Sequence, residues 1–398
     1  MLFRPWRLNE AWWAAAGALA LVLTRALPVP AAWSALARGF NVYLFLIGMM
    51  ALAEFARAEG VFDWIAASAV RAARGSQGRL LLLVYAAGVV TTALLSNDAT
   101  IIVLTPAVLV AVGRTDAHVE PYVFACALVA NAASTALPIA NPSNLLFFAT
   151  EMPPLGTWLG SFGWASLASI AATFIALRLV FARDVAPALH ERDDVYDDDV
   201  EPPRPLALFV LAFSALVLIV TSSMSGSLGI TACVLGVAAA LVATTIDRGA
   251  FGTIARGIAW PIVVLTGALF VLVDALDAAG ANALPRALFD WGHHVAAPLG
   301  ALTVAAAAAL ASNLVNNLPV GLELGKYAAS AHPAAALTAA ALVGVNVGPN
   351  LTVNGSLATL LWLAILRRAG VHVDARRFAA VGLLVTPPAL IVAALLAR

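Results

Sequence analysis

Long apolar stretches alternate with short polar ones along all 398 residues of the chain. Most of these stretches approach the roughly 20 residues that a helix needs to cross the hydrocarbon core of a bilayer. The pattern predicts an all-α polytopic membrane protein embedded in a lipid bilayer. We expect membrane spans at residues 12–29, 40–57, 119–150, 157–181, 206–223, 228–246, 258–279, 334–366 and 377–397.

Two further apolar blocks, 79–113 and 298–330, are interrupted near their middle by polar residues that favour turns. The interruption is Ser96-Asn97-Asp98 in the first block and the run 312–319 in the second. Non-helical backbone persists at membrane depth only where protein or a water-filled cavity satisfies it. We therefore predict two re-entrant hairpins with arms of about 15 residues and tips that face a cavity. Two ordinary helices per block are the alternative.

Two of the predicted spans, 119–150 and 334–366, are too long for one straight helix and carry proline or glycine near their middle. Pro138 and Pro142 interrupt the first, and Gly348, Pro349 and Gly355 interrupt the second. Proline removes a helical hydrogen bond and clashes with the preceding turn. Both spans are therefore predicted to be discontinuous helices, each unwound over a short polar segment.

The order of hairpin, broken helix and final span occurs once in each half of the chain. The spacing is repeated too, with 34 positions from Asn97 to Asn131 and 33 from Asn313 to Asn346. Interrupted hydrophobic segments at corresponding places in two halves are typical of inverted-repeat transporters, whose binding site lies at the repeat interface. We predict one repeat in residues 1–182 and a second, inverted repeat in residues 206–398.

Charged residues predict how the chain is oriented. Residues 183–205 are acidic and polar, and we expect them to form a cytoplasmic linker between the repeats, or else a docking site for a cytosolic partner. With the N-terminus in the cytoplasm, few basic residues other than Arg38, Arg286 and Lys326 lie outside, as the positive-inside rule requires. Segments 61–74 and 283–296 mix apolar and charged residues, which is typical of amphipathic helices in the interface.

Composition excludes several classes of function. The chain is 62% hydrophobic and 11% charged with a formal net charge of +0, so it has no electrostatic footprint for nucleic acid. No nucleophile paired with a base and no metal-ligand cluster is evident, so we expect no catalytic residue, metal or cofactor.

Cys126 and Cys233 lie in separate apolar runs and are expected to be small buried residues; a thiol site for a metalloid is the alternative.

The hairpin tips and helix breaks are rich in amide and hydroxyl side chains. Such groups form hydrogen bonds at membrane depth without the cost of an isolated charge. We predict that these side chains bind the solute, whereas the alternative for any one of them is to cap a helix or satisfy backbone. They are Ser96, Asn97, Asn131, Ser134, Asn141, Asn144, Asn313, Asn316, Asn317, Asn346, Asn350, Asn354 and Ser356.

Asp98 is an acid at a predicted hairpin tip, and an intramembrane carboxylate indicates a functional site. Burial disfavours its charged form, so Asp98 is suited to take up and release a proton as access alternates. We predict that it is the proton-coupling site; an N-cap for the second hairpin arm is the alternative. Glu323 lies nearer the outer boundary and three residues before Lys326, which predicts a local ion pair.

Three of these motifs resemble those of the arsenite/antimonite efflux permeases within the ion transporter superfamily. They are the run 95–99 followed by 104–106, the run Asn-Asn-Leu-Pro at 316–319, and Gly348-Pro349 followed by Gly-Ser-Leu-Ala-Thr-Leu-Leu-Trp at 355–362. The resemblance extends from about residue 38 to nearly the end of the chain. It implies a multi-pass protein of the bacterial inner membrane that exports arsenite or antimonite by proton antiport, sometimes with a cytosolic arsenical ATPase.

The chain also departs from that family. One span precedes residue 38 where the family typically has two, and Asn350 replaces the usual lysine after Gly-Pro. Asn131 and Asn346 stand where members of the family can carry acids, which leaves Asp98 more isolated.

A neutral trihydroxide suits a site of amides and hydroxyls. The alternative is an anion or dicarboxylate transporter of the same superfamily, with or without sodium coupling, which requires half-helix N-termini or an arginine.

Overall fold

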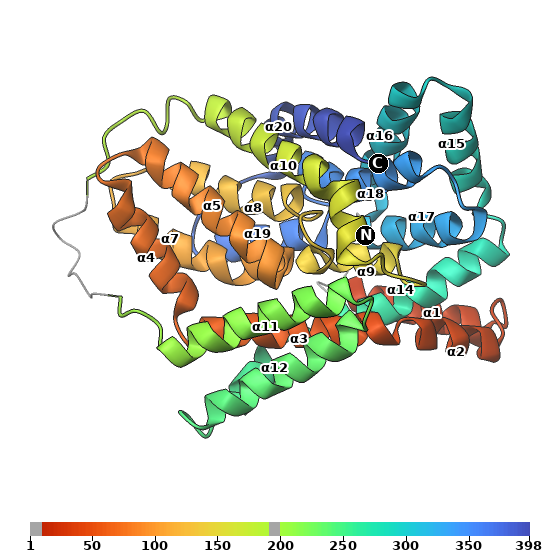
Figure 1. The fold of residues 1–398 in the computed structure, drawn as a ribbon, viewed down its shortest axis with the longest axis horizontal. Coiled ribbons are helices and arrows are strands. Elements are labelled where there is room, and N and C mark those ends of the chain that lie inside the picture. The colour runs from red at the N-terminus through yellow and green to blue at the C-terminus, as the bar shows by residue number, and fades with distance from the viewer. Residues whose placement is uncertain (1–9, 191–199) are drawn as a thin grey trace.

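A computed structural model describes residues 10–190 and 200–398 of the protein, and in these residues it is built of helices (Figure 1). Large apolar side chains are exposed on its outer helices, as expected for surfaces that contact lipid. The expected all-α polytopic fold is confirmed. Seven helices are long and apolar enough to cross a membrane: α3 (Phe40–Ala58), α5 (Gln77–Leu95), α10 (Leu155–Val180), α11 (Pro205–Ser223), α14 (Trp260–Ala278), α16 (Ala297–Val315) and α20 (Ala375–Leu396).

Both interrupted blocks fold into helical hairpins. In the first, α5 is followed by a return arm of α6 (Asn97–Ala99), the π-helical turn η2 (Thr100–Leu104) and α7 (Thr105–Gly113). In the second, α16 is followed by α17 (Asn317–Ala331). The first arm of each hairpin has 19 residues, not the expected 15 or so, because the helix continues up to the residue at the tip.

Each hairpin turns through a single residue in a conformation that is almost restricted to glycine. Ser96 has φ 107° and ψ 160°, and Asn316 has φ 83° and ψ 151°. Holding a residue with a Cβ atom in this region costs about 1–3 kcal/mol and is typical of functional sites. The two tips therefore share one strained backbone geometry.

The two long spans are interrupted helices. The first comprises α8 (Glu120–Ala132), the 3-10 turn η3 (Pro138–Ala140) and α9 (Pro142–Phe147). The second comprises α18 (Ala335–Val347), the 3-10 turn η4 (Gly348–Leu351) and α19 (Leu357–Arg368). Polar caps start the second segments, since Asn141 accepts from the amide of Ser143 at 2.9 Å and Ser356 accepts from that of Thr359 at 3.1 Å.

The repeats are inverted and interlocked. The first hairpin enters from the end of the molecule that carries α4 (Val61–Ala73), and the second enters from the opposite end, which carries α15 (Ala283–His294) (Figure 1). Helix α17 packs against α9, and η2 packs against α19. The return arm of each hairpin thus contacts the broken helix of the other repeat, which brings the four interruptions together.

The N-terminal region differs from expectation. The span predicted at 12–29 is a 14-residue helix, α1 (Glu10–Leu23), followed by a separate short helix, α2 (Val29–Arg38). Beside them, α3 packs against α12 (Leu228–Thr244), which leads into α13 (Ala250–Gly257). The α3–α12 contact brings backbones close, since a Cβ atom at Gly236 would lie 2.6 Å from the Gly48 carbonyl oxygen.

The predicted linker, 183–205, is described only at its two ends, because residues 191–199 lie outside the described residues. At its first end the His190 amide donates to Asp116 at 2.9 Å, and Ala188 forms a bridge with Ser76. This end of the linker is therefore attached to the turns that follow α4 and α7.

Candidate functional site

A cavity forms where the two hairpin tips meet the two helix breaks. Asn97 and Asp98 line it from the first tip, and Asn317 lines it from the second. Asn141 and Ser356 line it from the starts of α9 and α19. In this conformation its volume is about 10 Å³, close to that of one water molecule. These five of the predicted site residues share one pocket, which admits a larger solute only if the tips move.

The cavity lining combines these five polar residues with apolar ones such as Ile262 and Leu357, and it carries no basic side chain in the part of the chain that the structure describes. Asn97 is 3% exposed, and its side-chain oxygen is buried without a hydrogen-bond partner. Such an orphaned acceptor costs about 1–3 kcal/mol unless something binds it. An unpaired amide oxygen beside a cavity is the feature expected of a solute site.

Asp98 is buried and lies in the first turn after the tip. None of the ion pairs found among residues 10–190 and 200–398 involves it. The first tip also has no side-chain cap, whereas at the second tip the Asn316 side chain accepts from the amide of Leu318 at 3.2 Å. The N-cap role considered for Asp98 is therefore not observed. Leu318 holds the equivalent place in the second repeat.

Several predicted site residues instead bond to one another. Asn346 is fully buried at the end of α18. Its side-chain oxygen accepts from Asn141 Nδ2 at 2.9 Å and Ser143 Oγ at 2.6 Å, and its Nδ2 donates to Asn144 Oδ1 at 2.7 Å. Asn141 also donates to Ser134 Oγ at 2.9 Å. The three bonds of Asn346 join the broken helix of one repeat to that of the other.

A second set of bonds secures the unwound backbone. Asn131 donates to Asn350 Oδ1 at 2.9 Å, and Asn350 donates to the Leu128 carbonyl at 2.9 Å. Asn313 donates to the Gly348 carbonyl at 2.8 Å. The backbone-satisfying alternative fits Asn350 and Asn313. Asn131 bonds to a side chain instead, and its oxygen is buried without a partner.

Asn316 and Asn354 line a neighbouring cavity rather than the shared one. Cys126 is buried in α8 and Cys233 lies in α12, and both are free. Neither cysteine lines the cavity that the hairpin tips and helix breaks share. The thiol alternative for metalloid binding gains no support from this geometry.

Comparison with known proteins identifies the family. A family model described as a citrate transporter (CitMHS) matches residues 1–347. The chain belongs to the citrate transporter family. The chain is also 27% identical to an arsenical pump membrane protein of Escherichia coli, over 98% of this chain and 94% of that protein. It is 28% identical to an arsenical pump membrane protein of Yersinia enterocolitica, with the same coverage.

This citrate transporter family member is also similar to a second transporter by sequence and to a solved transporter structure by fold. An uncharacterized transporter of Mycobacterium tuberculosis is 25% identical over 89% of this chain and 85% of its own. The crystal structure of the YdaH transporter of Alcanivorax borkumensis shares the fold, with a TM-score of 0.58 and 15% identity over 92% of this chain and 86% of that one. The expected resemblance to arsenical permeases and the location in the bacterial inner membrane are confirmed.

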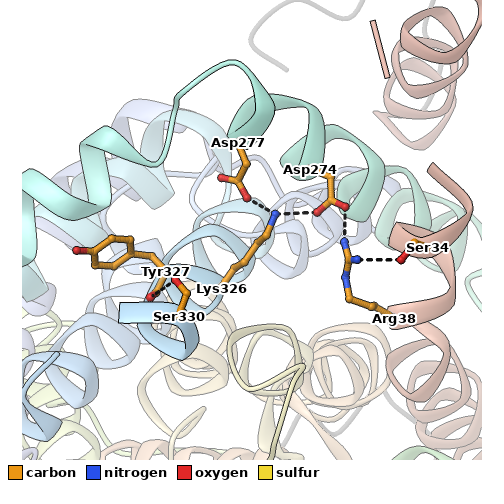
Figure 2. Close-up of polar contacts among 7 residues, drawn as sticks. All are labelled: Ser34, Arg38, Asp274, Asp277, Lys326, Tyr327 and Ser330. Atoms are coloured by element: carbon orange, nitrogen blue, oxygen red, sulfur yellow. Dashed lines mark hydrogen bonds and ion pairs between the residues drawn. The ribbon is translucent and has the colours of Figure 1, made fainter. Parts of the chain in front are cut away.

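Figure 2 shows a charge cluster of this transporter that joins α2, α14 and α17. Asp274 of α14 accepts from Lys326 Nζ of α17 at 2.8 Å and also pairs with Arg38 of α2. Lys326 pairs with Asp277 as well. The predicted Glu323–Lys326 pair is wrong, because Lys326 turns to the two acids on α14. Both Glu323 carboxylate oxygens are buried without a hydrogen-bond partner.

One buried acid, Glu54, is absent from the predicted site residues. It lies in α3, is 6% exposed, and bonds to Arg57 on the next turn. The sequence could have indicated Glu54, because it is an acid inside the apolar run 40–57, and an acid in a membrane segment indicates a functional site.

Proposed function

We propose that this transporter exports arsenite or antimonite in exchange for protons. The observation that supports the proposal is the shared cavity, which amide and hydroxyl side chains from four chain interruptions line together with one carboxyl group. A neutral trihydroxide brings hydrogen-bond donors and acceptors but no charge, so it needs no cation in the site. The arsenical pump relatives, which are similar over 98% of the chain, add support.

Asp98 is the proposed proton-coupling residue. In the closed cavity an unpaired carboxylate is costly, so it needs either a proton or several hydrogen-bond donors. The hydroxyl groups of the solute supply such donors. The two ligands then exclude each other, because a carboxyl that holds a proton no longer attracts the solute hydroxyls. When a proton and a trihydroxide occupy Asp98 in alternation, the transporter exchanges one for the other across the membrane, which is antiport.

The two hairpins are the proposed gates. They enter from opposite ends of the molecule (Figure 1) and both tips line the cavity. Withdrawal of the first tip would open the cavity toward the end that carries α4, and withdrawal of the second would open it toward the end that carries α15. Because the closed cavity holds about one water molecule, release of the solute requires such a movement.

Uptake into everted membrane vesicles tests the proposal. Vesicles with the wild-type protein should accumulate arsenite when their interior is acidified and lose this accumulation when the gradient is collapsed. Asp98→Asn should abolish proton-driven accumulation because the amide cannot exchange a proton. Full proton-driven accumulation by Asp98→Asn would contradict its role in coupling, and no arsenite uptake by the wild type would contradict the solute.

A second candidate is a citrate-like anion, as the family description suggests. One feature of the site favours it: Asn317 and Leu357, which start helices α17 and α19, both line the cavity. Helix N-termini carry partial positive charge and attract anions. The Asp98 carboxyl in the same lining opposes an anion, so arsenite is preferred. Uptake of labelled citrate by the same vesicles, with and without sodium, would reverse this preference.

A further inference from the structure

Asp98 lines a second cavity in addition to the solute cavity. Ser96, Asp98 and Ala99 line it, and Glu54 of α3 lines it as well. Its volume is about 20 Å³, which is enough for about one water molecule. The two buried acids therefore face a single water-sized space, although they lie on different elements.

Glu54 is held in a fixed position. Its Oε2 atom accepts from Arg57 Nε at 2.8 Å and Arg57 Nη2 at 2.6 Å. On the other side Gly257 is in close contact, since any Cβ atom there would overlap the Glu54 carboxyl group. The Arg57 side chain is 46% exposed and lies at the end of α3. Glu54 thus stands between the buried Asp98 and a solvated arginine.

We propose that Glu54 is a proton-relay residue that connects Asp98 to the aqueous surface at the end of α3, the cytoplasmic surface in the predicted orientation. The inference rests on the proposed proton antiport. In the inward step the Asp98 O–H bond breaks and an O–H bond forms on Glu54, directly or through one water molecule. Glu54 then gives its proton to solvent beside Arg57. Where a water molecule mediates the transfer, it gains the proton of Asp98 and gives one of its own protons to Glu54, so it is unchanged overall. The reverse sequence reloads Asp98.

The competing account is a static ion pair that anchors the end of α3. Arg57 on its own helix pairs with Glu54, and Asp98 on α6 lines the same cavity. Arg256 on α13 precedes Gly257, the residue that contacts Glu54. Arg256 Nε donates to the Gly252 carbonyl of its own helix at 2.9 Å. Among the described residues, Arg57 is the charged partner that bonds to Glu54. A test must therefore separate loss of the carboxyl group from loss of the pair.

Two variants make that separation. Glu54→Gln removes the group that carries the proton, and Arg57→Gln breaks the same ion pair but leaves the carboxyl group in place. For the purified protein in proteoliposomes, infrared spectroscopy follows deuteration of the Asp98 carboxyl after transfer to heavy water, with the band assigned by Asp98→Asn. We expect Glu54→Gln to slow this exchange by about 100-fold, the usual effect of losing a positioned proton-transfer group. Arg57→Gln should exchange nearly as fast as the wild type.

Arsenite transport provides the second measurement. Glu54→Gln should lose proton-driven accumulation in everted vesicles but retain exchange of labelled for unlabelled arsenite, which needs no net proton movement. Glu54→Asp should restore part of the accumulation. Equal defects in Glu54→Gln and Arg57→Gln, or unchanged deuteration in Glu54→Gln, would overturn the relay. The deuteration measurement needs no solute. A wild type that fails to carry arsenite would therefore contradict the proposed function, while the deuteration rates of the variants would still decide for or against the relay.

Discussion

Replacing Asn346 with leucine tests whether the bonds between the two broken helices hold the transporter together. Leucine has a similar volume but can neither donate nor accept a hydrogen bond. The change removes the bonds to Asn141, Ser143 and Asn144 and leaves those three groups buried without this partner. Asn346 is itself fully buried, so water cannot replace it without rearrangement.

The expected cost follows from the number of bonds lost. Hydrogen bonds between helices in membrane proteins contribute about 0.6 kcal/mol on average and reach about 1.7 kcal/mol. Loss of three such bonds therefore lowers the free energy of unfolding by about 2–5 kcal/mol. The upper end applies here, because the bonds form one buried network and each partner left behind carries its own desolvation cost.

Unfolding in mixed detergent micelles, followed by tryptophan fluorescence, measures this loss. The buried Trp158 and Trp362 report on both repeats, because Trp158 lies in α10 and Trp362 in α19. Each donates to a backbone carbonyl of the first broken span. Ser312→Ala is the matched control, because Ser312 is equally buried but its hydroxyl donates to the carbonyl of Ala308 in its own helix. It should cost less than about 1 kcal/mol. Equal stabilities of Asn346→Leu and Ser312→Ala would refute the reasoning.

Three further outcomes are expected. Ser96→Gly should raise the free energy of unfolding by about 1–2 kcal/mol, measured in the same micelles, because glycine adopts the tip conformation without strain. Asp274→Asn should cost no more than about 1 kcal/mol, and high salt should remove the difference from the wild type, because its partner Lys326 is partly exposed. Hydrogen bonds from His190, first that of its backbone amide, lower the pKa of Asp116 below its ordinary value of 3.8. The Asp116–His190 contact is therefore fully present above the ordinary pKa and is lost as the pH falls through the lowered pKa. Protection of the His190 amide from hydrogen exchange should disappear in that pH range. In Asp116→Asn, protection of this amide should show no such step with pH.

The sequence predicts the fold because each interruption has a local cause. Polar tips and prolines cannot continue a lipid-exposed helix, so they mark the hairpins and breaks wherever they occur. The length of the first arms was underestimated for a related reason. Residues such as Thr92 and Leu95 remain helical up to Ser96, since the turn needs only one residue with positive φ.

The sequence does not separate cavity-lining side chains from structural ones. Asn97 and Asn346 are both amides beside a predicted break, yet one faces the cavity and the other bonds across the repeat interface. The partner that decides this, Asn141, is 205 positions from Asn346. Likewise the i,i+3 rule paired Lys326 with Glu323, whereas acids on a helix about 50 positions earlier in the chain provide its partners. Tertiary contacts of this kind leave no local signal.

The symmetry of the backbone is not matched by symmetry of chemistry. At the second tip, Asn316 caps the amide of Leu318, and the amide of Asn317 donates to the Gly355 carbonyl at 3.0 Å. At the first tip, Ser96 makes no side-chain cap. The second tip is therefore fastened to its own repeat, while the first presents Asp98 and an unsatisfied amide oxygen to the cavity. If a proton and a solute compete for one group, that group must lie on the tip with fewer internal bonds, because a fully satisfied tip gains little from either ligand.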